Sequence, residues 1–274
     1  ATLPVWFYMG FVMITVGMMF KAAIVPFHFW SPDVYEGSPT LVTAVMSTLV
    51  KVAAIGALFK VMGILSAAMT PAYIIVLVII NILTLCVGNI TALKQTNIKR
   101  MMAYSGISHA GFMLIAFVAI GSSANAILYY AAAYSLAGIA AFAVILGVCN
   151  GKGNEEIDNF RGLIRKQPLL TAVMIGALLS LSGIPIFAGF FAKLFVFSQA
   201  LQAGYLILVI FGIINSIIAV YYYFGVINVM TAREKDEEPE PMKVAIEYKI
   251  VAAVAISLNI LLGIFPSIVM GLNL

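Results

Sequence analysis

Eight long runs of mostly apolar residues take up most of this chain, and they limit its fold more than any other feature. A helix needs about 20 mostly apolar residues to cross the hydrocarbon core of a bilayer. The runs are continuous instead of alternating, which argues against a transmembrane β-barrel. Helices also satisfy their own backbone polar groups in lipid. The expected spans cover roughly residues 4–30, 40–66, 71–93, 103–121, 123–149, 168–199, 204–229 and 246–271.

Charged residues make up only 9% of the 274 residues, whereas hydrophobic residues make up 63%. A soluble domain carries roughly 25% charged residues, so this chain has too few to cover a water-facing surface. Its net charge of +4 is therefore no sign of nucleic-acid binding. We predict an all-α, polytopic helix bundle that forms one transmembrane domain, residues 1–274, within the lipid bilayer. The chain starts at Ala1 without a methionine or a basic signal sequence, which suggests part of a longer protein.

Basic residues in the predicted loops gather on one side of the membrane. When the connections are numbered in order, the odd ones hold ten basic residues, and the opposite side has only Lys60, near a helix end. The ten are Lys94, Lys99, Arg100, Lys152, Arg161, Arg165, Lys166, Arg233, Lys235 and Lys243. Because cytoplasmic loops carry the excess of lysine and arginine, we place the odd connections in the cytoplasm and both chain ends outside. We interpret the charged stretch 233–241 as a solvated cytoplasmic loop without a site.

Three lysines lie inside apolar runs, where a charge is unexpected: Lys21, Lys51 and Lys193. A lysine at the centre of a helix in lipid costs about 2.5–3.5 kcal/mol, so these three should face a wet or polar interior. Such a lysine suits proton transfer, because burial penalises its charged form. The alternative is that the side chains extend to the headgroups, which fits Lys51 least because it lies near the middle of its run. No Asp or Glu of this chain lies at mid-membrane, so counter-charges would come from elsewhere.

Gly183 and Pro185 interrupt the sixth run shortly before Lys193. Proline removes a backbone donor, and the freed groups need protein or water around them, which is typical of the broken helices of transporters. A plain kink is the alternative. The first run is similar, with Pro26 after Lys21. These two runs are five apart in order and cross in opposite directions, as an inverted repeat requires.

His109 follows a stretch rich in hydroxyl side chains, residues 104–108. Imidazole suits proton transfer near neutral pH, so His109 is a candidate relay. A structural histidine bonded to a neighbouring helix is the alternative. We interpret His28 as an anchor at a cytoplasmic helix end. Cys86 and Cys149 lie far apart without metal-ligand spacing, so we expect no metal in this chain.

Several ordered motifs resemble the antiporter-like subunit N, or subunit 2, of respiratory complex I, the proton-pumping NADH:quinone oxidoreductase. The first is PFHFWSPDVYEGSPT at residues 26–40, whose core DVYEG looks more like subunit N than like subunits L and M. The others are NIKRMMAYS with HAG within residues 97–111, RGL at 161–163, LSGIP at 181–185 and GFFAK at 189–193. The resemblance covers essentially the whole chain.

The resemblance implies an antiporter-like fold of fourteen helices, of which this chain carries the last eight. It implies that Lys21, Lys51 and Lys193 match the family's central-axis lysines on its seventh, eighth and twelfth helices. It also implies that segments 4–30 and 168–199 are the family's discontinuous helices. The first six helices are absent, and one of them carries the intramembrane glutamate that pairs with the lysine matching Lys21. This chain alone should therefore not form a complete proton channel.

We therefore expect a multi-pass subunit in the cytoplasmic membrane of a bacterium, or in an equivalent energy-transducing membrane, that serves respiratory electron transport. It would translocate protons along a lysine-lined axis, with other membrane subunits of complex I as partners. NADH, FMN, iron–sulfur clusters and quinone would bind those partners, because this chain has no Gly-rich phosphate loop or cysteine cluster. The alternatives are a cation/proton antiporter or membrane-bound hydrogenase subunit, which residues 33–37 disfavour, and a structural subunit without a proton path.

Overall fold

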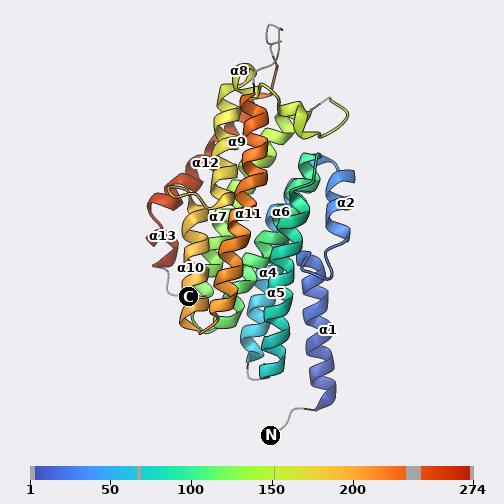
Figure 1. Cartoon of the computed structure of the whole chain (residues 1–274), viewed down its shortest axis with the longest axis vertical. Helices are drawn as coiled ribbons and strands as arrows, with labels where there is room; N and C mark the ends of the chain where they lie inside the picture. The colour runs from blue at the N-terminus through green and yellow to red at the C-terminus, as the bar shows by residue number, and fades with distance from the viewer. Residues whose placement is uncertain (1–3, 67–68, 151, 233–241, 272–274) are drawn as a thin grey trace.

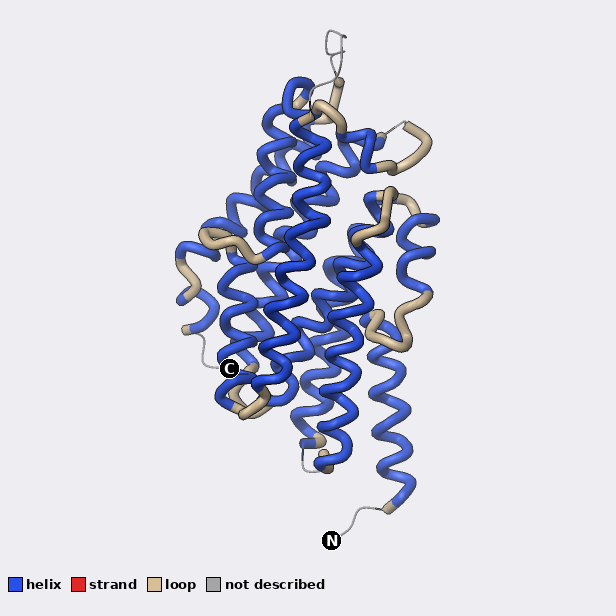
Figure 2. Tube along the Cα trace, viewed as in Figure 1, coloured by secondary structure: helices blue, strands red, loops and turns tan. Residues whose placement is uncertain are grey.

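The computed structural model describes residues 4–66, 69–150, 152–232 and 242–271, and its helices run roughly along one long axis (Figure 1). Across those residues the regular structure is helical, apart from an isolated bridge between Asn97 and Glu156 (Figure 2). The helices are α1 Val5–Ala22, α2 Trp30–Gly37, α3 Thr40–Val45, α4 Lys51–Ile64, α5 Pro71–Ala92, α6 Ile98–Ile115, α7 Ala124–Cys149, α8 Leu163–Lys166, α9 Pro168–Ser182, α10 Ala188–Gln202, α11 Leu206–Thr231, α12 Ile246–Ile264 and α13 Ser267–Met270. A π-helical turn, Met46–Val50, joins α3 to α4, and 3-10 turns occur at Ala116–Ala119 and Ile157–Phe160.

Seven helical stretches of the described chain are long and apolar enough to cross a membrane. They are Val5–Ala22, Thr40–Ile64, Pro71–Ala92, Ile98–Ala119, Ala124–Cys149, Leu206–Thr231 and Ile246–Ile264. An eighth crossing consists of two half-helices, α9 and α10, which follow one another down the bundle in Figure 1. The predicted bundle of about eight spans is therefore confirmed.

The centre of the bundle is formed by α6 and α7. In the most apolar part of the spanning stretch that contains α6, 89% of the residues are buried, and the share in α7 is 72%. The other spanning stretches of the described chain bury only 22–39% of the corresponding residues. The outer helices expose leucine, isoleucine and valine side chains, which suits contact with lipid. Polar groups on α6 and α7 are surrounded by protein, so they must find their partners on neighbouring helices.

The first apolar run is broken, as expected for a discontinuous helix. After α1, Ala23 takes a left-handed backbone conformation (φ 58°), and α2 then covers much of the predicted loop 31–39. The indole Nε1 of Trp30 donates a hydrogen bond to the carbonyl oxygen of Phe20 (2.9 Å), which satisfies one acceptor at the end of α1. His28 is buried inside this break, so its interpretation as an anchor at a cytoplasmic helix end is wrong.

The helix that carries His109 begins at Ile98 instead of at residue 103. The Asn97 side chain caps it by accepting hydrogen bonds from the backbone N–H groups of Lys99 (2.8 Å) and Arg100 (3.2 Å). Lys99 is therefore helical, only 2% exposed, and paired with Glu155 at 2.8 Å. Its assignment to a loop was wrong, because the cap adds a helical turn before the apolar run.

The loops with many basic residues lie at one end of the bundle. The backbone N–H of Ile157 donates to the carbonyl of Thr96 (2.8 Å), which joins the third predicted connection to the fifth. At the other end, the Ser122 hydroxyl donates to the Gln199 side chain (2.8 Å). Figure 1 places these two groups of connections at opposite ends of the long axis. Arg233 and Lys235, with the rest of the stretch 233–241, lie outside the described residues.

We expect cysteines introduced at Thr96 and Ser122 to be labelled from opposite sides of the membrane, with position 96 on the cytoplasmic side. Both side chains are exposed at opposite ends of the bundle, and the basic loops set the orientation. The measurement is reaction with a membrane-impermeant maleimide in intact cells and in inverted vesicles, after replacement of Cys86 and Cys149 by alanine. Labelling of both positions from the same side would contradict the eight-span topology.

Candidate proton-transfer site

Lys51 opens α4 directly after the π-helical turn, and its side chain points into the bundle with 2% exposure. Its Nζ lies 5.6 Å from the centroid of the Tyr35 ring, within the range of a cation–π contact. Among the described residues it has no hydrogen-bond partner. π-Helical turns are rare and often occur at functional sites, and this one immediately precedes the buried amine.

Gly106 on α6 provides the space that the Lys51 amine occupies. A Cβ at position 106 would lie 2.6 Å from the Nζ of Lys51 and 3.0 Å from the hydroxyl oxygen of Tyr134. The Tyr134 hydroxyl, on α7, also lies 3.2 Å from the Ser47 hydroxyl in the π-helical turn. The amine of Lys51 and the Tyr134 hydroxyl therefore both border the space beside Gly106, with no hydrogen bond from the amine among the described residues.

His109 connects three helices through both of its ring nitrogens. Its Nδ1 lies 2.9 Å from the Tyr130 hydroxyl on α7, and its Nε2 lies 3.3 Å from the Tyr223 hydroxyl on α11. The Tyr223 hydroxyl lies a further 2.5 Å from the Ser105 hydroxyl. The Tyr134 ring is packed against the imidazole at 4.9 Å between centroids. His109 is 4% exposed, so its ring contacts these side chains and not bulk water.

Lys193 lies on α10, just after the break that Gly183 and Pro185 introduce. Gly183 ends α9 with a left-handed backbone (φ 88°), a conformation that glycine adopts without steric cost. The break frees the carbonyl group of Ser182, and the Nζ of Lys193 donates to it at 2.8 Å. The same Nζ lies 4.6 Å from the centroid of the Phe112 ring. The break between α9 and α10 therefore holds the Lys193 amine, whose residue is only 5% exposed.

The structure brings Lys51, His109 and Lys193 together in the middle of the bundle. Both lysines lie within electrostatic range of His109. In the described ranges, neither lysine forms an ion pair. Lys21 is not part of this group, because its side chain is exposed on the outer face of α1. The site that this chain builds by itself is therefore the row from Lys51 through His109 to Lys193.

Sequence reasoning missed most of the hydroxyl groups of this row. Tyr130 and Tyr134 are spaced four residues apart on one face of α7, and Tyr223 comes from α11. A buried tyrosine hydroxyl usually has a hydrogen-bond partner, so tyrosines within apolar runs were the available signal. A second polar cluster lies nearby, where the Asn89 amide donates to the Ser108 hydroxyl (2.7 Å) and to Asn215 (3.1 Å).

The acidic residues of the 33–37 motif are structural in this chain. The Arg100 guanidinium donates to Asp33 and to Glu36, each at 2.6 Å, which attaches α2 to the start of α6. Asp33 is 74% exposed, and ion pairs this open contribute about 0–1 kcal/mol each. They orient the short helix and do not reach the lysine row.

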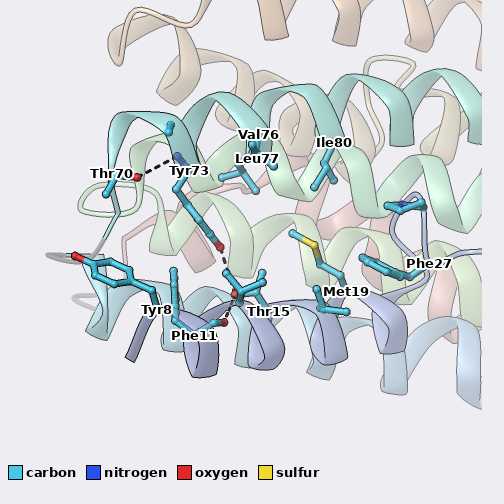
Figure 3. A pocket seen from close by; sticks show the side chains of 14 residues that line it. Tyr8, Phe11, Thr15, Met19, Phe27, Thr70, Tyr73, Val76, Leu77 and Ile80 are labelled. Carbon is cyan, nitrogen blue, oxygen red and sulfur yellow. Dashed lines mark hydrogen bonds between the residues drawn. The ribbon is translucent and has the colours of Figure 1, made fainter. Parts of the chain in front are cut away.

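A groove of about 510 Å³ lies between α1 and α5 (Figure 3). The hydroxyl groups of Thr15 and Tyr73 lie 3.3 Å apart across it, and Thr15 also donates to the carbonyl of Phe11 (2.9 Å). None of the residues that line it is charged. The groove is therefore an apolar feature between two helices and is separate from the row of Lys51, His109 and Lys193.

Comparisons with known proteins identify related membrane proteins. Residues 5–219 match the transmembrane family described as NADH:quinone oxidoreductase/Mrp antiporter. NADH-quinone oxidoreductase subunit N of Flavobacterium johnsoniae is 55% identical, over 99% of this chain and 60% of its own. Subunit N of Cytophaga hutchinsonii is 40% identical, over 98% and 59%.

Solved structures give the same result for the fold. A chain of respiratory complex I from Thermus thermophilus, with bound aureothin, has 37% identity and a TM-score of 0.81, over 93% of this chain and 56% of that chain. A chain of the Mrp complex from Dietzia has 19% identity and a TM-score of 0.86, over 95% and 57%, which shows a shared fold.

The chain spans about three fifths of the length of the curated relatives it matches. The family match nevertheless runs from α1 into α11 and includes the whole lysine row. The chain is a multi-pass membrane protein, and it belongs to the NADH:quinone oxidoreductase/Mrp antiporter transmembrane family.

Proposed function

We propose that this chain is the larger part of a subunit N of NADH:quinone oxidoreductase, and that it translocates protons along Lys51, His109 and Lys193. The names of its relatives support the subunit assignment over a separate cation/proton antiporter. Its bacterial relatives and apolar helices place it in a bacterial plasma membrane. Oxidation of NADH and reduction of quinone belong to other subunits in this proposal, and this chain holds no cofactor.

The observation that carries the proposal is the group of three buried titratable side chains, Lys51, His109 and Lys193, none of which is paired with a carboxylate among the described residues. A permanently charged lysine is costly at mid-membrane, whereas a neutral amine costs much less. Lys51 and Lys193 therefore suit a cycle in which each amine binds a proton and releases it again. A static structural role would call for a fixed counter-charge, and the described residues supply none to either lysine.

The hydroxyl and imidazole groups between the lysines can pass on a proton and keep the same protonation state overall. A tyrosine or serine hydroxyl accepts a proton on its oxygen and gives up its own hydrogen to the next acceptor. Neutral His109 can take a proton at one ring nitrogen and release one from the other. Lys51 would give its proton toward Tyr134, and Lys193 would receive one from the His109 side. Lys21 would join the row through parts of the subunit beyond this chain.

We expect alanine at Lys51 or at Lys193 to lower proton pumping while the complex still assembles. Arginine should fail as well, because a guanidinium keeps its charge and effectively never deprotonates. The measurement is NADH-driven proton uptake in inverted vesicles that contain the full-length subunit, normalised to assembled complex on native gels. A structural ion pair predicts the opposite order, in which arginine is tolerated and alanine lowers assembly.

The matched control is Lys60→Ala, which removes an exposed lysine from the same helix as Lys51. It should leave uptake at the level of the unmodified complex. Full pumping with arginine at both Lys51 and Lys193 would show that these lysines are fixed charges, and the proposed function would then be wrong.

A further inference from the structure

His109 has hydrogen-bond partners on two neighbouring helices, but Lys193 is not one of them. Both ring nitrogens of His109 are already placed against tyrosine hydroxyls, Tyr130 and Tyr223. The Lys193 amine is directed at the Ser182 carbonyl, on the far side of the helix break. Across the described residues no hydrogen bond links His109 to Lys193, although the two lie within electrostatic range. A proton cannot pass between them in this arrangement without a further group or a movement.

The Phe112 ring lies close to both His109 and the Lys193 amine. It is three residues after His109 on α6, so the two side chains share a face of the helix. Its centroid is 6.0 Å from the imidazole centroid and 4.6 Å from the Nζ of Lys193. The ring is 1% exposed and is packed against Tyr130 and Phe197. A benzene ring has no acidic proton to donate and no lone pair to accept one, so it cannot relay a proton between its neighbours, while its face contacts the Lys193 amine.

Lys193 also lines a cavity, together with Phe197, which packs against Phe112. This partly open cavity of about 240 Å³ lies between α10 and α11, and its polar lining residues are Ser182, Lys193 and Ser216. The Ser216 hydroxyl oxygen is buried and has no hydrogen-bond partner among the described residues. Because a water molecule takes about 30 Å³ of liquid volume, this space has room for several. Water held by these polar groups would give Lys193 a proton partner other than His109.

We propose that Phe112 is a gate between His109 and Lys193, and that this structure shows the gate closed. The proposal rests on the proposed function, because a gate needs a proton path to control. A permanently connected row would let protons flow back between the two sides. With the ring in place, Lys193 communicates with the cavity alone. Transfer from His109 requires the ring to swing away or water to pass it, and the cycle can couple that movement to the redox reaction.

The test uses Phe112→Val and Phe112→Leu in the full-length subunit within the assembled complex. Inverted vesicles report two quantities: protons taken up per NADH oxidised, and the decay rate of the pH gradient after NADH is exhausted. We expect the smaller side chains to lower the proton yield per NADH and to speed the decay several-fold, with valine stronger than leucine. Adding Lys193→Ala to Phe112→Val should restore slow decay, because the leak needs Lys193 as its carrier.

The matched control is Phe117→Val, which removes another fully buried phenylalanine of the same spanning stretch, one whose ring packs against Phe59. It should leave the yield and the decay unchanged. Assembled Phe112 variants with normal yield and normal decay would overturn the gate. So would loss of assembly in both Phe112 variants while Phe117→Val assembles, since the ring would then be a packing residue.

The lysine variants distinguish a failure of the gate from a failure of the proposed function. If alanine at Lys51 and at Lys193 lowers pumping while the Phe112 variants behave normally, only the gate is wrong. If the lysine variants pump normally, the proton path itself is wrong. A leak in Phe112→Val that persists with Lys193→Ala would also overturn the gate, because the protons would then follow another route.

Discussion

Alanine at Gly106 is expected to lower proton pumping about as strongly as the loss of Lys51, in a complex that still assembles. The new methyl group would lie 2.6 Å from the Lys51 amine and 3.0 Å from the Tyr134 hydroxyl, whereas ordinary contacts are 3.4–4 Å. The amine is the end of a flexible side chain, so it moves away and the fold is kept. A displacement of about 1 Å at a reacting group can cost about 10²-fold in rate, so the transfer between Lys51 and Tyr134 should suffer most.

The measurement is proton uptake per assembled complex, with NADH oxidation recorded in the same vesicles. Gly56→Ala is the matched control, because Gly56 is on the same helix as Lys51 and a Cβ there meets nothing within 4 Å. Normal pumping in assembled Gly106→Ala would mean that the position of the Lys51 amine does not limit proton transfer. That result would argue against proton transfer along the lysine row, and the description of the fold would still hold.

Alanine at Gly189 is expected to prevent assembly of the subunit. The first turn of α10 lies directly against the last turn of α9, and the Gly189 N–H donates to the Ser180 hydroxyl (3.2 Å). An added Cβ would overlap the carbonyl oxygen and carbon of Ser180, which are backbone atoms and cannot rotate away. Overpacking a core costs typically about 1–3 kcal/mol and occasionally more, and a clash with backbone belongs at the upper end. The half-helices would separate and move Lys193 from the Ser182 carbonyl.

The amount of subunit in assembled complex on native gels, and its thermal unfolding in detergent, would measure this effect. Gly225→Ala on α11 serves for comparison, since a Cβ at that position meets nothing within 4 Å in this chain. Normal assembly and stability in Gly189→Ala would show that the two half-helices can move apart freely. The close approach at the break would then not be what holds Lys193.

The helical bundle could be predicted from the sequence, and the reason lies in the solvent. An apolar run of about 20 residues in lipid has to satisfy its own backbone groups, and a helix is the local structure that does so. The two interruptions were also predictable, because glycine and proline act on their own backbone and need no partner. Gly183 ends α9 for that local reason. The Asn97 cap is another local signal, and it explains why α6 starts earlier than the apolar run suggests.

The side chains around the candidate site depend on the packing of helices that are distant in sequence. His109 meets Tyr130, 21 positions later, and Tyr223, 114 positions later. No local sequence pattern predicts which tyrosine of an apolar run will contact which histidine. The position of Phe112 between His109 and Lys193 likewise depends on how α6 packs against α10.

The three lysines show the division between sequence and tertiary structure most clearly. In the sequence, apolar residues flank each of the three, Lys21, Lys51 and Lys193. The sequence therefore predicts an unusual charge in a membrane span at each position. Their environments nevertheless differ, because Lys51 and Lys193 are buried beside aromatic rings and Lys21 is exposed on α1. The sequence by itself determined the helices, their order across the membrane and the presence of these charges, since those follow from local hydrophobicity and backbone chemistry. Only the tertiary structure decided which face of each helix is covered, and a side chain's partners and exposure depend on that face.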